Sequence, residues 1–209
     1  MSGRLQQAPG IEALRAAWLH GLHTRPALPT GFPELDAALP GGGWPLGAIT
    51  ELMAAPAGIG ELSLLLPALA RLSRAGRHIA WIAPPWLPYP PGLAQHGVVL
   101  ERMLVVREHD PAARLWALEQ LLRCPAVGAA LAWPVALDDR RVRRLQLAAE
   151  AGGGCGLLYR PLAAALEHSP AALRLQLQPQ AHGLHVEIRK ARGGRAHALV
   201  VHPAAALCA

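Results

Sequence analysis

The segment AAPAGIGELSLLLPALA, residues 54–70, has the spacing of a phosphate-binding loop that leads into an apolar helix. The working motif is G-x-x-x-x-G-K-[ST], whose lysine neutralises the β- and γ-phosphates and whose hydroxyl holds magnesium. Here Ala55 and Gly60 occupy the two glycine positions, Glu61 the lysine position and Leu62 the hydroxyl position. The chemistry of this spacing is nucleotide binding, but two of the groups that perform it are replaced.

The replacement of the lysine by Glu61 opposes nucleotide binding. A carboxylate about 4 Å from a phosphate oxygen costs about 4 kcal/mol at an effective dielectric near 20, and the lost attraction of the lysine has the same sign. We therefore expect ATP binding to be weaker by several powers of ten, and no cofactor. A structural interpretation of Glu61 is also open, because an acidic side chain at a helix start interacts favourably with the helix dipole.

The other acidic groups of a nucleotide hydrolase are also missing. The strand expected over residues 77–83 runs into two prolines, and the strand expected over 127–133 ends in Trp133 and is followed by a proline. Phosphoryl-transfer enzymes need groups that orient the attacking water and hold magnesium. The pair Asp138-Asp139 comes several residues later and is expected to cap a helix. We therefore expect no catalytic residues.

The elements that would position this loop alternate between strand and helix, which predicts a mostly parallel sheet covered on both faces. Strands are expected at 48–53, 77–83, 103–106, 127–133 and 155–160, and helices at 33–39, 60–76, 110–124 and 138–152. From about residue 171 the pattern changes to apolar-polar alternation, with a Gly193-Gly194 turn signal, which predicts an antiparallel β extension.

The chain ends differ in character from the middle. Residues 10–23 predict an amphipathic helix that includes Trp18, followed by a proline-containing tether. This helix either packs on its own core or acts as an arm that binds a partner. We divide the chain into a helix and tether (1–29), an α/β core (30–170) and an antiparallel extension with a tail (171–209).

Composition limits the class of protein. The 209 residues carry a net charge of +6 with ten histidines counted as neutral, which permits contact with nucleic acid or an acidic partner. The three cysteines are far apart and have no metal-ligand spacing, so we expect no metal and a reduced, cytoplasmic setting. No signal peptide or membrane span is expected.

Four surfaces are candidates for binding a partner or DNA. They are the Trp18 helix, the proline-rich segment with Trp86 and Tyr89, the helix with Arg140, Arg141, Arg143 and Arg144, and the hairpin with Arg189, Lys190, Arg192 and Arg195. Each has a simpler interpretation. Trp86 could fill the vacated nucleotide pocket, the helix arginines could form a solvated face partly paired with Asp138 and Asp139, and the hairpin cations could protect a sheet edge from aggregation.

A longer pattern resembles the RecA-like ATPase core over about residues 30–160. It comprises Thr30-Gly31, Leu35-Asp36, Leu39, Gly41-Gly42-Gly43, Pro45, Gly47, Ile49 and Glu51, followed by the loop and helix. The resemblance implies a RecA-like fold, and the substitutions above make the chain a pseudo-ATPase within it.

Several segments resemble the ImuA family more closely, over about residues 28–195. They read LPGGGWP, GIGELSLLLPALARL, WIAPPWLPYPPGL, LAWP, RRLQLAAE and SPAALRLQL. The resemblance implies an SOS-induced, non-enzymatic adaptor of translesion DNA synthesis. Its implied partners are an ImuB-type inactive polymerase, RecA and a DnaE2-type polymerase, with weak DNA binding and self-association also open. The related SulA proteins imply an alternative, a cell-division inhibitor that binds FtsZ.

Overall fold

The computed structural model describes residues 26–55, 59–134, 136–181 and 183–203. Its main sheet has eight strands in the order β10-β9-β8-β3-β7-β6-β4-β5. The strands are β3 (Ala48–Ala54), β4 (His78–Ile82), β5 (Met103–Val106), β6 (Val127–Ala132), β7 (Cys155–Pro161), β8 (Leu173–Gln180), β9 (Gly183–Ala191) and β10 (His197–Val201). Neighbours from β8 to β5 pair in parallel, whereas β9 pairs antiparallel with both β8 and β10.

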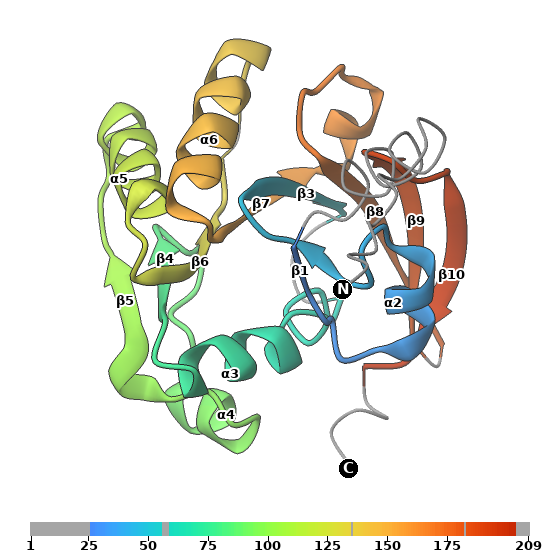
Figure 1. Cartoon of the computed structure of the whole chain (residues 1–209), viewed down its shortest axis with the longest axis horizontal. Coiled ribbons are helices and arrows are strands. Elements are labelled where there is room, and N and C mark those ends of the chain that lie inside the picture. Colours follow the sequence, from blue (N-terminus) through green and yellow to red (C-terminus); the bar gives the residue numbers. More distant parts are fainter. Residues whose placement is uncertain (1–25, 56–58, 135, 182, 204–209) are drawn as a thin grey trace, which may run out of the picture.

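Helices cover both faces of this sheet (Figure 1). On one face, α5 (Pro111–Arg123) and α6 (Asp139–Gly152) enclose a core with Leu118, Leu122 and Leu145 at its centre. The other face carries α2 (Pro33–Ala38), α3 (Leu66–Arg74) and α4 (Pro90–Gln95), which belong to a second and larger core. Every residue of β6 is buried, as expected of a strand between two covered faces.

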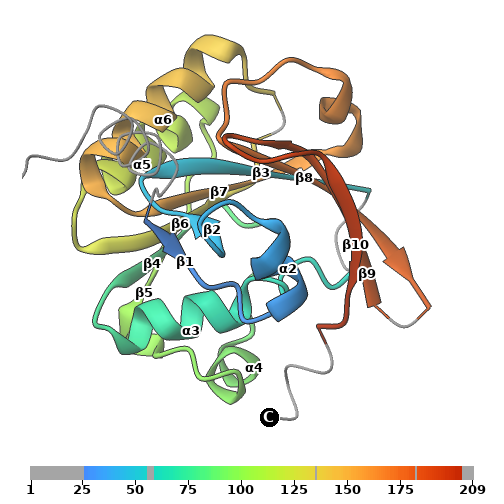
Figure 2. The same cartoon turned by 45° about the vertical axis from the view of Figure 1, so that its right-hand side comes forward.

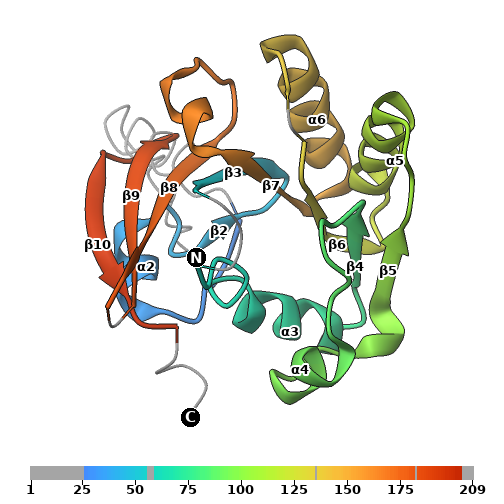
Figure 3. The same cartoon turned by 180° about the vertical axis from the view of Figure 1, so that it is seen from behind.

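The antiparallel strands form one end of the molecule. Figure 2 shows β9 and β10 curving beside α2, which contacts β10. Figure 3 shows β5 at the opposite end, next to α5. A small two-stranded sheet of β1 (Ala27–Leu28) and β2 (Trp44–Pro45) lies before β3 in the chain.

The predicted fold class is confirmed as α/β, with a mostly parallel sheet, helices on both faces and antiparallel strands at the C-terminal end. One direction differs from expectation, because β8 pairs in parallel with β3, from Thr50–Leu173 to Ala54–Leu177. Side-chain alternation follows the faces of a strand but carries no information on the direction of its neighbour. The predicted N-terminal helix and Trp18 lie outside the described residues.

The helix predicted over residues 60–76 is shorter in the structure. Residues 61–65 form hydrogen-bonded turns, and α3 begins at Leu66 with Pro67 in its first turn. Proline is tolerated there because the first N–H groups of a helix have no partner within the helix. The short helix α4 was not predicted, because prolines at 90 and 91 resemble a loop signal although they also suit a first helical turn.

A buried ionic cluster joins the three central strands β3, β7 and β8. The Glu51 side chain is 0% exposed, and its carboxylate accepts hydrogen bonds from Arg160 at 3.1 Å and from Arg174 at 2.7 Å. Ser169 donates a third hydrogen bond at 3.0 Å. Arg160 and Arg174 also bind Glu167, through its carboxylate and its backbone carbonyl respectively. The cluster therefore fastens the loop after β7 to the centre of the sheet.

Candidate functional site

The loop after β3, which has the spacing of a phosphate-binding loop, binds one of its own carboxylates. Glu61 Oε2 accepts a hydrogen bond from the backbone N–H of Ile59 at 2.9 Å. In a working loop, backbone N–H groups of this kind point at the phosphates. Here the Glu61 carboxylate takes the place of a phosphate as the acceptor for one of these N–H groups. The same negative charge would repel an incoming phosphate.

The helix-dipole interpretation of Glu61 is wrong for this structure. Glu61 lies in the turns five positions before Leu66, where α3 begins. The dipole effect falls off within the first helical turn, so it does not account for the glutamate. Its hydrogen bond to Ile59 provides the structural explanation instead.

Three aromatic rings from β4, β7 and the residue after β6 stack on one another. The centroids of Trp81 and Trp133 are 5.9 Å apart with planes inclined at 20°, and those of Trp133 and Tyr159 are 5.0 Å apart with planes inclined at 3°. Such stacked pairs add to the stability gained from burying their area. Trp81 lies near the end of β4, Trp133 directly after β6 and Tyr159 within β7.

The Tyr159 hydroxyl connects this stack to the loop. It donates a hydrogen bond to the backbone carbonyl of Glu61 at 3.5 Å. Burial raises the pKa of Tyr159 well above its ordinary value, and the nearby Glu61 carboxylate raises it further. The phenol is therefore neutral at physiological pH and available as a donor.

Two cavities adjoin the stack. One of about 670 Å³ lies towards Arg160 and Leu162, and one of about 340 Å³ lies towards Trp86 and Tyr89. Four residues line both of them: Glu61, Pro85, Trp133 and Tyr159. Their walls are mainly apolar with few polar groups, as in many ligand or partner sites.

The proline-rich segment after β4 presents its aromatic side chains to solvent. The chain turns at Ala83, whose φ of 45° is rare for a residue with a side chain. Beyond this turn, Trp86 is 78% exposed and Tyr89 is 71% exposed. The interpretation of Trp86 as a buried core residue is therefore wrong, because its side chain stands in solvent.

The four arginines of α6 are all exposed, while Val142 and Leu145 between and beside them are buried, as the helical spacing predicts. Arg144 forms an ion pair with Glu119 of α5, and Arg141 lies 3.9 Å from Asp138. Asp139 interacts with His168 instead of an arginine. For Arg140 and Arg143, no ion pair with another described residue is found.

The basic residues of the C-terminal hairpin do not form one cluster. Arg189 pairs with Glu187 at 2.8 Å, and Arg192 and Arg195 are exposed. The Lys190 ammonium instead donates to the backbone carbonyl of Ser169 at 2.6 Å. Partial burial lowers the pKa of Lys190, with Arg192 and Arg174 adding to the effect. Lys190 therefore supports the loop after β7 and does not contribute to a solvent-facing basic tip.

The described part of the chain offers no other obvious chemistry. It contains no group of three or more His, Cys, Asp or Glu side chains placed to hold a metal ion. None of its helices has both the length and the apolar character needed to cross a membrane.

Comparison with known proteins connects this geometry to a family. The family model for the cell division inhibitor SulA matches residues 47–156, slightly more than half of the chain. The chain belongs to the SulA family. It is 36% identical over 138 residues to Protein ImuA of Caulobacter vibrioides strain NA1000 / CB15N, which covers 64% of this chain and 57% of that protein. It is 33% identical over 100 residues to the cell division inhibitor SulA of Yersinia pestis strain Pestoides F, which covers 47% of this chain and 59% of that protein.

The resemblance to ImuA and SulA proteins is thus confirmed. The SulA family model covers one part of the molecule and not the rest. The segment matched by the SulA family runs from the start of β3 into β7. It includes the loop after β3, the exposed Trp86, Trp133 and the arginines of α6. It leaves out Arg160, Arg174 and the strands β8, β9 and β10. The chain spans less than three fifths of the length of these relatives.

Sequence reasoning found Trp133 as the residue in place of a carboxylate, but it missed the stack that Trp133 forms. Trp81 and Tyr159 are 52 and 26 positions away in the chain, and only the parallel pairing of β4, β6 and β7 brings them to Trp133. A usable signal is present, since an aromatic residue comes near the end of each of these three apolar strands.

Proposed function

We propose that this chain is an accessory protein of SOS-induced translesion DNA synthesis that acts by binding other proteins and not by catalysis. Its similarity to Protein ImuA supports the pathway. Its proposed partners are an ImuB-type inactive polymerase, RecA and a DnaE2-type polymerase. Within this proposal, the RecA-like core is a pseudo-ATPase whose rigid sheet presents binding surfaces.

The observation that carries the binding role is the exposed aromatic segment at the carboxyl edge of the sheet. Trp86 and Tyr89 stand in solvent next to a cavity walled by Trp133 and Tyr159. Tryptophan and tyrosine dominate binding hot spots because they bury a large area and have few rotatable bonds to immobilise. The prolines at 84, 85, 88 and 90 restrict the backbone in advance, which lowers the entropy cost of binding.

The absence of ATP chemistry in this proposal rests on the loop geometry. Glu61 already binds the Ile59 N–H, and Leu62 replaces the magnesium-holding hydroxyl. Trp133 follows β6, at the position where the resemblance to RecA-like ATPases implies a carboxylate that supports magnesium.

Affinity measurements with an ImuB-type protein test this proposal. We expect Trp86→Ala/Tyr89→Ala to weaken binding about thirtyfold or more, because each anchor of a hot spot contributes more than about 1 kcal/mol. Leu147→Ala is the matched control, since Leu147 is 59% exposed on α6 and lines neither cavity beside the stack. Equal affinities for the double variant, the control and the parent chain would show that Trp86 and Tyr89 do not take part in binding the ImuB-type protein.

A second candidate function is inhibition of cell division by binding FtsZ. It is supported by the SulA family match and by the similarity to the Yersinia protein. Parallel measurements with purified FtsZ and ImuB-type protein separate the two candidates. Inhibition of FtsZ polymerisation without binding of the polymerase-like protein would favour the second candidate over the first.

A further inference from the structure

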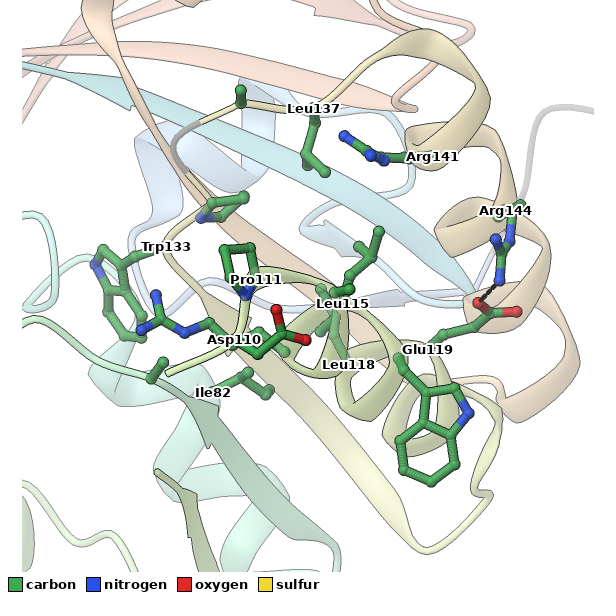
Figure 4. Close-up of a pocket in the computed structure, with 16 residues that line it drawn as sticks. Ile82, Asp110, Pro111, Leu115, Leu118, Glu119, Trp133, Leu137, Arg141 and Arg144 are labelled. Carbon is green, nitrogen blue, oxygen red and sulfur yellow. Dashed lines mark hydrogen bonds and ion pairs between the residues drawn. The ribbon is translucent and has the colours of Figure 1, made fainter. Parts of the chain in front are cut away.

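A groove of about 690 Å³ lies between α5 and α6 (Figure 4), and neither Trp86 nor Tyr89 lines it. Its floor is apolar and includes Leu115, Leu118 and Leu137. Figure 4 shows these side chains between Trp133 at one end and the Arg144–Glu119 pair at the other. The volume is within the range of sites that hold a ligand or several side chains of a partner.

The acidic groups of this groove are already engaged. Asp110 caps α5, because its carboxylate accepts the backbone N–H of Ala113 at 2.8 Å. Glu119 is bound by both Arg123 and Arg144, and its pKa is lowered, first by its hydrogen bond to Arg123 and further by Arg144. Glu119 is therefore ionised, and the two arginines compensate its charge. Asp110 keeps its negative charge, because its partner is a neutral N–H group. Three arginines line the groove against these two carboxylates, so the lining has a net positive charge.

The cations of the rim are less fully compensated. Arg114 donates its Nε–H to the backbone carbonyl of Glu108. Because this carbonyl is neutral, the hydrogen bond does not compensate the positive charge of Arg114. Arg141 is exposed and lies 3.9 Å from Asp138, a contact longer than a hydrogen bond. The groove thus combines an apolar floor with a rim that favours negative charge.

We propose that the α5–α6 groove binds an acidic amphipathic segment of a partner protein. Apolar side chains of the segment would cover Leu115 and Leu137, and its carboxylates would meet Arg141 and Arg114. A nucleic-acid backbone matches the cations but not the apolar floor of the groove. This inference is independent of the role proposed for Trp86 and Tyr89, so either can fail without the other.

Fluorescence anisotropy with a labelled synthetic peptide of about 15 residues, long enough to form a helix, tests the proposal. The probe places leucines at positions i, i+3, i+4 and i+7 and glutamates beside them. Two matched peptides replace the glutamates by lysines, or the leucines by alanines. We expect measurable binding of the first peptide only.

Variants of α6 then locate the binding site. Arg141→Glu should weaken the acidic peptide about fivefold or more, because an attraction at the rim becomes a repulsion. Arg140→Glu is the matched control, since Arg140 is an exposed neighbour on α6 that does not line the groove, and it should change affinity less than about twofold. Leu115→Glu should abolish binding, and circular dichroism confirms that each variant is folded.

Three results would overturn the proposal. Equal binding of the lysine peptide would show that the rim does not select charge. Equal losses in Arg140→Glu and Arg141→Glu would indicate general electrostatic attraction to α6. Tighter binding of a synthetic peptide of this chain's own residues 1–25 would assign the groove to that segment instead of to a partner.

Discussion

At the residue scale, Glu51 makes the strongest demands on its surroundings. Its carboxylate is fully buried between Arg160 and Arg174. Removal of one member of a buried ionic cluster leaves the others charged and without compensation, which costs about 3–5 kcal/mol. We expect Glu51→Gln to lower the free energy of unfolding by this amount in urea titrations. Glu187→Gln, which breaks the exposed pair with Arg189, should cost less than about 1 kcal/mol.

Cys155 gives a prediction with a definite pH dependence. Burial raises the pKa of Cys155 from 9.0 to about 12. The folded state thus holds the thiol proton more tightly than the unfolded state. The contribution of the protonated thiol to the free energy of unfolding is complete below about pH 9. As the pH rises towards 12, this free energy falls by up to about 1.4 kcal/mol per pH unit. Urea titrations at pH 8 and 10.5 should show Cys155→Ala gaining about 1–2 kcal/mol relative to the parent chain over this interval. A constant difference between the two proteins would contradict the assignment.

Glu61 leads to a prediction about nucleotide chemistry. Glu61→Lys restores one charge of the loop, but Leu62 still lacks a hydroxyl and the stacked Trp133 still stands in place of a carboxylate. We expect neither the parent chain nor the variant to release phosphate from ATP with magnesium above the buffer rate. Turnover by the parent chain would refute the pseudo-ATPase proposal, whereas turnover by the variant alone would show that Glu61 is the only barrier.

At the scale of elements, α6 depends on its N-cap. The Asp138 carboxylate accepts the backbone N–H of Arg141 at 2.7 Å. Asp138→Ala should lower the free energy of unfolding by about 1 kcal/mol, while Asp138→Asn, which retains an acceptor, should cost much less. Thermal or urea unfolding measures both, and equal losses would assign the effect to charge instead of capping.

The close approach of α5 and α6 rests on a glycine. A Cβ added at Gly152 would lie 2.1 Å from the backbone carbonyl oxygen of Leu122. Because backbone cannot move aside cheaply, we expect Gly152→Ala to cost about 1–3 kcal/mol although alanine favours helices. Ala151→Gly on the exposed side of α6 is the control and should cost about 1 kcal/mol through helix propensity alone.

Elements with strong local signals were predicted well, and those set by distant partners were not. Asp110 and Asp138 cap α5 and α6 as expected because capping depends on residues three positions away. By contrast, the partners of Glu51 come 109 and 123 positions later. Their meeting depends on the order of strands in the sheet, which local periodicity does not encode.

The same distinction applies to the candidate site. The replacements at Glu61 and Leu62 are visible in the sequence because a motif fixes their positions. The exposure of Trp86 was left open, since an aromatic residue among prolines is compatible with either a core or a surface position. The groove between α5 and α6 was missed because it exists only after two helices 15 residues apart in the chain are packed side by side.

At the scale of the whole molecule, the net charge of +6 predicts a weak and general affinity for nucleic acid. The candidate basic residues do not form one surface, because they lie on α6 and around the turn between β9 and β10, and Lys190 is engaged internally. We expect binding to single-stranded DNA to show no sequence preference and to fall at least about tenfold between 50 and 200 mM salt. Anisotropy titrations with two unrelated oligonucleotides measure this, and salt-resistant, sequence-dependent binding would contradict it.

Trp133 occupies an unusual position, because it lines the α5–α6 groove as well as both cavities beside the aromatic stack. One indole ring thus separates the groove proposed for the acidic segment from the cavity beside Trp86 and Tyr89. If a partner bound on one side tilts this ring, the shape of the cavity on the other side changes as well. Binding at the two sites would then be either cooperative or mutually exclusive. The fluorescence of Trp133 would change on each binding event.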